Sequence, residues 1–301
     1  MARCIDLFSG CGGLSLGFQM AGVDVVAACE NWHDAADVYR KNFNHDVHEI
    51  DLTDVSAASE LVSRYNVDGI IGGPPCQDYS TAGKKQEGDR ARLTCCFARI
   101  VHNVWPSFFV MENVARAQKS DAYKAARAIF LASGYNIAEI VLDAAYCGVP
   151  QHRKRFFCVG LLRDVPFFDE LFNGVARAMC AEKPLTVRDY MGDKIDYDFY
   201  YRHPRNYHRR AVYSVDEPAA TVRGTSMRGV APSFPGHPSD AAPVHAQMHV
   251  MSLRELARVQ TFPDTFIFDG KQTAIGQMLG NSVPVNLAKF VATVLKRFID
   301  E

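Results

Sequence analysis

The chain has 301 residues, of which 48% are hydrophobic and 22% charged, values that are ordinary for a globular protein with one large domain and a smaller lobe. The formal net charge of -1 gives the chain as a whole no affinity for polyanions, so any contact with nucleic acid must come from a local patch. The N-terminus lacks an apolar signal segment, and no apolar run nears the length of a membrane span, so we expect a cytoplasmic protein that does not bind membranes.

Nine cysteines are spread along the chain without a Cys-x-x-Cys pair. Cys4, Cys29 and Cys158 fall in apolar segments, where a reduced cysteine packs as a small hydrophobic residue. This usage indicates a reducing compartment and no structural zinc.

Short apolar strands alternate with helical stretches through the first half of the chain. We expect strands at residues 3–8, 23–29, 47–50, 67–71, 107–111, 136–142 and 156–162, with helices ending at 21 and spanning 34–42, 57–65, 92–104 and 121–133. The alternation predicts an α/β fold with a mostly parallel sheet and helices on both faces. Ligands of such folds bind at the carboxyl ends of the strands, where Ser9, Glu30, Pro74 and Glu112 fall.

The pattern changes between about 163 and 250, where Pro, Gly, Tyr, His and Arg occur with no clear period. Regularity returns at Ser252-Leu-Arg-Glu255, a capping-box sequence that predicts a helix to about Gln260. A last helix with one apolar face should begin at Pro284 or Val285.

A glycine-rich turn, Gly10-Cys-Gly-Gly13, follows the first expected strand, and Glu30 ends the second one about 20 residues later. Glycines let the backbone approach a ligand closely, and an acid at this spacing binds ribose hydroxyls. The pair predicts a nucleoside cofactor, but by itself it does not separate NAD from S-adenosylmethionine.

A thiol and a carboxyl group lie at the ends of two further strands. Cys76 ends Gly72-Gly-Pro-Pro-Cys76 after the run 67–71, and the stiff Pro-Pro turn with polar residues behind it favours an accessible sulfur over a buried one. Glu112 lies in Met111-Glu-Asn-Val114, at the end of another apolar strand. A nucleophile beside an acid indicates covalent catalysis.

Six motifs in this order and spacing resemble those of the DNA (cytosine-5) methyltransferase family. They are Asp6-Leu-Phe-Ser-Gly-Cys-Gly-Gly13, Gly73-Pro-Pro-Cys-Gln77, Glu112-Asn-Val114, Gln151-His-Arg-Lys-Arg155, Arg254-Glu-Leu-Ala-Arg-Val-Gln260 and Gly280-Asn-Ser-Val-Pro284. The resemblance implies a Rossmann-like methyltransferase domain formed by 1–165 and 250–301, with a small irregular target-recognition domain at 166–249. It also implies a stand-alone enzyme of restriction-modification or phage type.

The resemblance implies a mechanism in which the Cys76 thiolate adds to carbon 6 of cytosine. Glu112 would hold or protonate ring N3, which requires a carboxyl group that can share a proton. Arg155 matches the arginine near O2 of the base, where its planar donor fork suits a carbonyl oxygen, and Arg153 is the second candidate for this role.

The resemblance also implies a set of residues around S-adenosylmethionine, with Asp51 accepting from the adenine amino group. The set is Phe8, Gly10, Gly12, Gly13, Leu14, Glu30, Asn31, Asp51, Leu52, Pro74, Leu93, Asn281, Ser282 and Val283. Many relatives have an aromatic residue directly after the acid that corresponds to Glu30. Here Asn31 takes that position and Trp32 follows, so either could contact adenine.

Two basic segments are expected to contact DNA. Gly83-Lys-Lys-Gln-Glu-Gly88 and Arg90-Ala-Arg92 predict a mobile basic loop that closes over DNA. Residues 201–230 hold six arginines against two acidic residues, a local net charge of +4 with tyrosines interleaved. The expected contacts are Gln77, Ser80, Arg90, Arg92, Arg209, Arg210, Thr221, Arg223 and Arg228. A base must leave the duplex to reach a thiol in a cleft, so we expect this region to hold duplex DNA with a flipped-out base.

Two rival functions remain. A tRNA cytosine-5 methyltransferase of related fold usually carries Phe after the catalytic cysteine, where this chain has Gln77, and a catalytically inactive DNA-binding regulator tends to lose the thiol or the acid. We expect duplex DNA as the partner, a monomer, and a cognate restriction endonuclease that acts separately. His245 and His249 lack a third ligand nearby, so no metal is expected.

Overall fold

The computed structural model describes residues 1–75, 92–226 and 228–300. Among the predicted site residues, Cys76, Gln77, Ser80 and Arg90 lie outside the described residues, as does most of the basic loop. The chain divides into two compact units, which are described separately. The first unit is Met1–Leu142, Lys154–Cys180 and Ala288–Glu301, and the second is Asp143–Arg153 and Ala181–Leu287.

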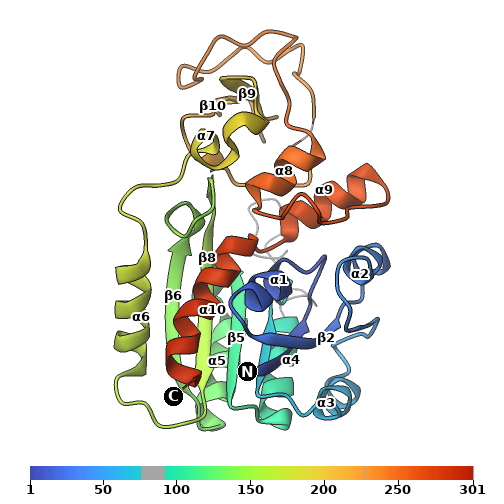
Figure 1. Ribbon diagram of the computed structural model, residues 1–301, viewed down its shortest axis with the longest axis vertical. Coiled ribbons are helices and arrows are strands. Elements are labelled where there is room, and N and C mark those ends of the chain that lie inside the picture. The colour runs from blue at the N-terminus through green and yellow to red at the C-terminus, as the bar shows by residue number, and fades with distance from the viewer. Residues whose placement is uncertain (76–91, 227, 301) are drawn as a thin grey trace. The chain divides into compact units, whose positions relative to one another are not determined.

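A seven-stranded sheet forms the centre of the first unit (Figure 1). Its strands, in spatial order, are β3 (Asp46–His48), β2 (Asp24–Cys29), β1 (Arg3–Leu7), β4 (Gly69–Gly72), β5 (Phe108–Val114), β8 (Lys154–Leu161) and β6 (Asn136–Asp143). The pairs from β3 to β5 are all parallel, whereas β8 runs antiparallel to β5. The predicted α/β fold with a mostly parallel sheet is confirmed.

Helices cover both faces of this sheet, as expected for strands that are apolar along their whole length. Helices α3 (Val55–Ser63), α4 (Arg92–Val104) and α5 (Asp121–Ala132) share one buried core with the strands. Helices α1 (Gly13–Met20) and α10 (Val285–Ile299) lie on the opposite face (Figure 1).

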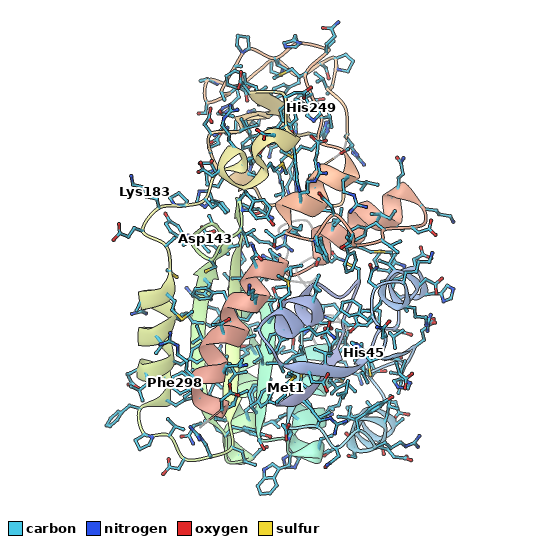
Figure 2. The ribbon with its side chains drawn as sticks, in the orientation of Figure 1. Met1, His45, Asp143, Lys183, His249 and Phe298 are labelled. Carbon is cyan, nitrogen blue, oxygen red and sulfur yellow. The ribbon has the colours of Figure 1, made fainter. Side chains whose placement is uncertain are left out.

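An additional helix, α6 (Phe168–Met179), lies within the segment where the sequence shows no clear period. Phe168 and Phe172 on its buried face pack against Phe298 of α10, which is labelled in Figure 2, with ring centroids 5.5 and 5.9 Å from that of Phe298. The prediction of an irregular chain was therefore wrong here. The helix follows Pro166 and an exposed Phe167 with φ of +58°, and Asn173-Gly174 interrupts its pattern.

The second unit consists of short elements. Strand β7 (Gln151–His152) pairs in parallel with β11 (Ala219–Ala220), and β9 (Phe199–Tyr201) pairs antiparallel with β10 (Val212–Ser214). Its helices are α7 (Val187–Met191), α8 (Leu253–Val259) and α9 (Gln272–Asn281). The predicted capping box is confirmed, because Ser252 and Glu255 exchange hydrogen bonds at the start of α8, whereas α9 was not predicted.

The two units do not coincide with the predicted domain limits. Helix α6 belongs to the first unit, although the predicted recognition domain begins at 166. Residues 250–287 belong to the second unit, although they were predicted in the catalytic domain. The assignment of DNA recognition to 166–249 stays a prediction.

Among the described residues, the stretch Gln272–Ile299 is long and apolar enough to cross a membrane by length and composition alone. The helical conformation is broken between α9 and α10, and 61% of the most apolar window is buried inside the protein. These features are typical of core helices in a globular protein.

Two glycines allow a test of how tightly the first unit is packed. A Cβ atom at Gly160 of β8 would lie 2.0 Å from the ring of Phe109, so Gly160→Ala should lower the free energy of unfolding by about 1–3 kcal/mol. Gly174 of α6 is exposed and has no atom within 4 Å of such a Cβ, so Gly174→Ala should raise it by about 0.5–1 kcal/mol. Urea denaturation of both variants measures the difference, and equal stabilities would contradict the packing described here.

Candidate active site

The turn after β1 has a backbone that few residues adopt. Phe8 has φ of +61°, and Gly10 and Gly12 have φ of +55° and +96°. A Cβ at Gly12 would lie 2.3 Å from the ring of Phe43, so packing requires glycine there. Among the described residues, a Cβ at Gly10 would meet no atom within 4 Å, so packing does not explain this glycine. Non-glycine residues with positive φ cluster at ligand sites, which makes the turn a candidate cradle.

Glu30 holds this turn to the end of β2. Its Oε2 accepts a hydrogen bond of 2.7 Å from the Gly10 amide, and its Oε1 accepts one of 2.7 Å from the Trp32 amide. Each carboxylate oxygen keeps a further lone pair that can accept from a hydroxyl group. Ser9 Oγ is buried and has no hydrogen-bond partner among the described residues. These donors and acceptors fit a polar nucleoside cofactor that lies against the turn.

The remaining predicted cofactor residues of the first unit lie near neighbouring strand ends. Gly13 and Leu14 begin α1 and are buried, and Leu93 is half-buried in the first turn of α4. Asn31 follows β2 and is exposed. After β3 come exposed Asp51 and buried Leu52, and buried Pro74 follows β4. Asp51 follows β3 by three residues rather than ending it, and its Oδ1 accepts from the Thr53 amide at 2.9 Å.

Three predicted cofactor residues belong to the second unit. Asn281 is exposed and ends α9, Ser282 is half-buried, and Val283 is buried. The Ser282 carbonyl accepts hydrogen bonds from Arg153 and Gln260, so this segment has a fixed backbone. Its role toward the cofactor stays a prediction.

A buried ion pair joins Glu112 and Arg155 near the end of β5. Arg155 Nε lies 2.8 Å from Glu112 Oε1, and the side chains are only 13% and 10% exposed, respectively. The antiparallel register sets Arg155, near the start of β8, opposite Val114. A Cβ at Gly73 would lie 3.0 Å from Glu112 Oε2, so glycine lets the turn that leads to Cys76 approach the carboxylate.

Asn113, which was not predicted as a site residue, connects the same two segments. It is 2% exposed, and its side-chain amide donates to the Pro74 carbonyl at 3.3 Å. Its Oδ1 accepts from the Val114 amide at 2.8 Å. The sequence feature that could have identified Asn113 is its polar side chain next to Glu112 in an otherwise apolar strand.

Arg153 has different contacts from Arg155. Its guanidinium is buried in the second unit and donates to the carbonyls of Gly280, Ser282 and Val222 at 2.8, 2.9 and 3.2 Å. These contacts hold main-chain segments together, whereas Arg155 lies beside the candidate catalytic acid. The arrangement favours Arg155 over Arg153 as the contact to the base.

Two buried glutamines extend the contacts of Arg153. Gln151 Nε2 donates to Gln260 Oε1 at 2.7 Å, and Gln151 Oε1 accepts from the Val222 amide at 2.8 Å. Gln260 also donates to the carbonyls of Leu279 and Ser282. Gln151 and Gln260 lie in two of the motifs, but the sequence did not predict a role for either side chain, because their partners are distant in the sequence.

The predicted DNA contacts fall into two groups. Arg92, Arg209 and Arg228 are exposed to solvent, and Arg210, Thr221 and Arg223 are half-buried. The contacts of the half-buried residues are Arg210 with Glu217 and the ring of Tyr213, Thr221 Oγ1 with the His152 carbonyl, and Arg223 with the His203 carbonyl.

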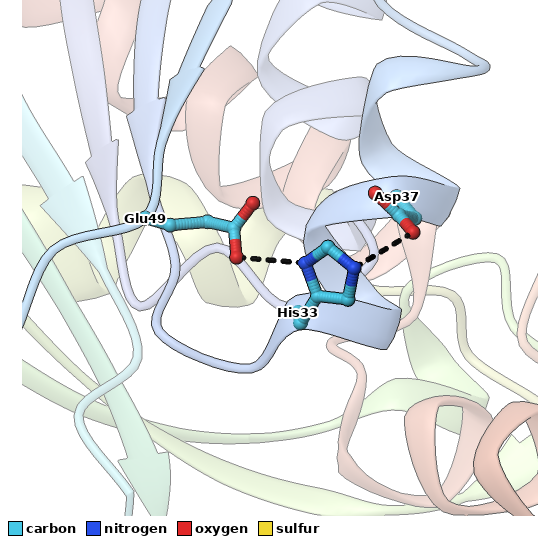
Figure 3. A group of neighbouring side chains, drawn as sticks. All are labelled: His33, Asp37 and Glu49. Carbon is cyan, nitrogen blue, oxygen red and sulfur yellow. Dashed lines mark hydrogen bonds and ion pairs between the residues drawn. The ribbon is translucent and has the colours of Figure 1, made fainter.

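An exposed cluster of His33, Asp37 and Glu49 lies just after Trp32 (Figure 3). His33 Nδ1 is 2.9 Å from Glu49 Oε2, and its Nε2 is 3.4 Å from Asp37 Oδ2. The hydrogen bond to Glu49, supported by Asp37, raises the pKa of His33. Arg40 bonds both carboxylates at 3.0 and 2.7 Å, so a cation already occupies the place where a metal would bind. The cluster is therefore best described as a surface ion-pair network.

The fold is α/β, and its strand ends hold a glycine-rich turn bonded to Glu30 and an acid–arginine pair, Glu112 and Arg155, near the Pro74 turn. A sequence model of the C-5 cytosine-specific DNA methylase family matches residues 2–297. The chain is 46% identical over 301 residues to the Type II methyltransferase M.HindV of Haemophilus influenzae, covering 99% of this chain and 98% of the relative. It is also 46% identical over 300 residues to M.HgiDI of Herpetosiphon aurantiacus, with 99% and 96% covered.

Solved structures show the same fold. The Dnmt2 methyltransferase of S. pombe superposes with a TM-score of 0.76 at 18% identity, covering 100% of this chain and 99% of the other. The chain belongs to the C-5 cytosine-specific DNA methylase family, and it is an enzyme that methylates carbon 5 of cytosine in DNA.

A buried carboxyl group lies in β1, just before the cofactor turn. Asp6 is fully buried, and its Oδ2 accepts a hydrogen bond of 2.5 Å from Ser15 Oγ. Tyr39 donates to Ser15 at 2.8 Å and contacts His45 at 2.7 Å; His45 is labelled in Figure 2. Burial raises the pKa of Asp6 to about 7, against the opposing effect of the Ser15 hydrogen bond.

This raised pKa gives a pH dependence with a defined sign. The folded state holds the Asp6 proton up to about pH 7, whereas an unfolded chain releases it near pH ~4, so the contribution to stability is lost as pH rises through that window. Asp6→Asn removes the titration, so the stability of the variant relative to wild type should rise by on the order of 2 kcal/mol from pH 5 to pH 7. Urea denaturation at both values measures it, with exposed Asp164→Asn as the control that should show no such change. A constant difference for Asp6→Asn would contradict the raised pKa.

Proposed function

We propose that the enzyme methylates cytosine within a specific short sequence of duplex DNA, through a covalent bond between Cys76 and carbon 6 of a flipped-out base. The observation that carries this proposal is the ion pair between Glu112 Oε1 and Arg155 Nε, which are 2.8 Å apart. The Glu112 carboxylate also lies close to Gly73, in the segment Gly73-Pro-Pro that leads to Cys76. An acid and a planar donor fork side by side match ring N3 and O2 of cytosine, which are adjacent acceptors on one edge of the base.

S-adenosylmethionine, when bound, supplies the methyl group. Phe8, Gly10 and Glu30 would hold its ribose and methionine parts, because the Gly10 amide donates to the Glu30 carboxylate and so keeps both at the same turn. Asp51 would accept from the adenine amino group beside Leu52. Asn281, Ser282 and Val283 are also proposed as cofactor contacts, and no metal would take part.

Each catalytic group has a defined task. The sulfur of Cys76 forms a bond to carbon 6 as the carbon 5–carbon 6 double bond opens, and the negative charge that develops in the ring is offset by a proton shared between Glu112 and N3 and by Arg155 at O2. Carbon 5 thereby gains the electron density that methylation requires. Loss of the proton from carbon 5 then restores the double bond as the carbon–sulfur bond breaks. Asn113 would keep the Pro74 turn at the correct distance from Glu112.

The second unit would recognise the DNA, and the flipped base would be delivered to the thiol by unstacking from the duplex. The relatives M.HindV and M.HgiDI are named Type II methyltransferases, which supports a modification enzyme with a separately acting endonuclease. We propose that the protein acts as a monomer in a prokaryotic cytoplasm, where the DNA is.

Cys76→Ala should abolish methyl transfer, because it removes the thiol that adds to carbon 6. Duplex DNA that carries 5-fluorocytosine should trap the unmutated enzyme covalently, since fluorine cannot leave as the proton does. Transfer of labelled methyl groups to DNA and to tRNA, with denaturing gels for the adduct, gives both readouts. Cys180→Ala, which removes a free, half-buried thiol, is the control that should keep activity. Undiminished turnover by Cys76→Ala would refute the mechanism, and labelling of tRNA alone would refute the substrate.

Trp32, rather than Asn31, should stack on adenine. Its amide is fixed by Glu30 and its side chain is half-buried, whereas Asn31 is exposed. Stacking of an aromatic ring on a base contributes about 1–3 kcal/mol, so Trp32→Ala should raise the KM for the cofactor about tenfold or more, with kcat changed little. Asn31→Ala should leave this KM within about twofold. Steady-state kinetics with saturating DNA measures both, and the opposite ranking would assign the contact to Asn31.

A further inference from the structure

Two arginines of the second unit each donate a hydrogen bond to a main-chain carbonyl near the other arginine. Arg202, which follows β9, donates from Nη2 to the carbonyl of Thr221. Arg223, two residues after Thr221, donates from Nη2 to the carbonyl of His203 at 2.7 Å. Each guanidinium is thus bound to the main chain next to the other arginine, and the two positive charges lie close together.

The acidic residues around this pair are already engaged. Glu217 pairs with Arg210, Asp216 pairs with Arg188, and Asp240 accepts from the amides of Ala211 and Val212. Within the described parts of the chain, no carboxylate lies within ion-pair distance of either arginine of the pair.

The charge of the pair is partly withdrawn from water. The Nε atoms of Arg202 and Arg223 are buried and have no hydrogen-bond partner among the described residues. Burial, together with repulsion from Arg202, Arg205 and Arg209, lowers the pKa of Arg223 to about 10. Like charges held together without a counter-ion are costly, and a bound anion would remove most of that cost.

We propose that Arg202 and Arg223 form a binding site for one phosphodiester group of the DNA backbone, with exposed Arg209 at its rim. This inference rests on the proposed function, since it names how the DNA substrate is held. A guanidinium fork matches two phosphate oxygens, and the phosphate supplies the negative charge that the site lacks. A base edge carries no net charge and would leave the repulsion between the arginines in place.

The test compares the salt dependence of DNA binding between variants. Once bisulfite sequencing has identified the methylated site, fluorescence anisotropy measures the Kd for a duplex with that site and for one without it, over a range of salt concentrations. Arg223→Met should weaken binding roughly tenfold for both duplexes alike and reduce the slope of log K against log salt by about 1. Arg188→Met is the matched control, because this arginine is neutralised by Asp198 and Asp216, and its slope should stay that of wild type.

A second variant keeps the test decisive if Arg223→Met fails to fold. Arg223→Lys keeps the charge but not the fork, so both duplexes should lose affinity equally with the slope unchanged. A loss confined to the duplex with the methylated site would show that Arg223 contacts a base, and unchanged affinity for both would show a purely structural role; either result overturns the proposal. Wild-type protein that neither binds nor methylates duplex DNA would instead overturn the proposed function, so the two failures are distinguishable.

Discussion

The antiparallel pairing of β8 with β5 is the constraint on which the candidate active site depends. In a fully parallel sheet the start of one strand and the end of its neighbour lie at opposite edges, and for the eight residues of β8 that separation is about 25 Å. Reversal of one strand brings Arg155 within 2.8 Å of Glu112. A buried ion pair contributes little net stability because desolvation of both groups is costly, so the fully buried residues 156–161 of β8 must supply the packing that holds the pair in place.

The cofactor turn is supported in a similar way by segments far from it in the sequence. Tyr39 of α2 (His33–Arg40) stacks on Phe43 at 4.2 Å between ring centroids, and Phe43 fills the space beside Gly12 that a side chain would need. The hydroxyl of Tyr39 reaches Ser15, which in turn bonds Asp6. Helix α2 and the residues that follow it thus support both the backbone of the turn, through Phe43, and the polar interactions beside it, through Tyr39. A turn with left-handed residues persists only where its surroundings define it so closely.

The sequence predicted the elements whose patterns are local, and missed those that depend on distant partners. Glu30 and Glu112 could be identified because each is a polar residue directly after an apolar run. Helix α8 could be identified because its capping box, Ser252-Leu-Arg-Glu255, is a pattern of four consecutive residues. Helix α6 was missed, since its apolar face is defined by contact with α10. The different contacts of Arg153 and Arg155 could not be foreseen either, because the carbonyl of Gly280 that Arg153 binds is 127 residues away.

The arginines of the second unit differ in whether a carboxylate neutralises them. Arg188 and Arg210 are balanced by nearby acids and behave as structural cations, whereas Arg202 and Arg223 donate to main-chain carbonyls and have no carboxylate partner among the described residues. Because the whole chain has a net charge of -1, there is little long-range attraction to any polyanion. Binding then depends on a phosphate that arrives at a particular place with a particular geometry. An enzyme that must find one short sequence among many gains from this arrangement, since weak general attraction shortens its residence on unrelated DNA.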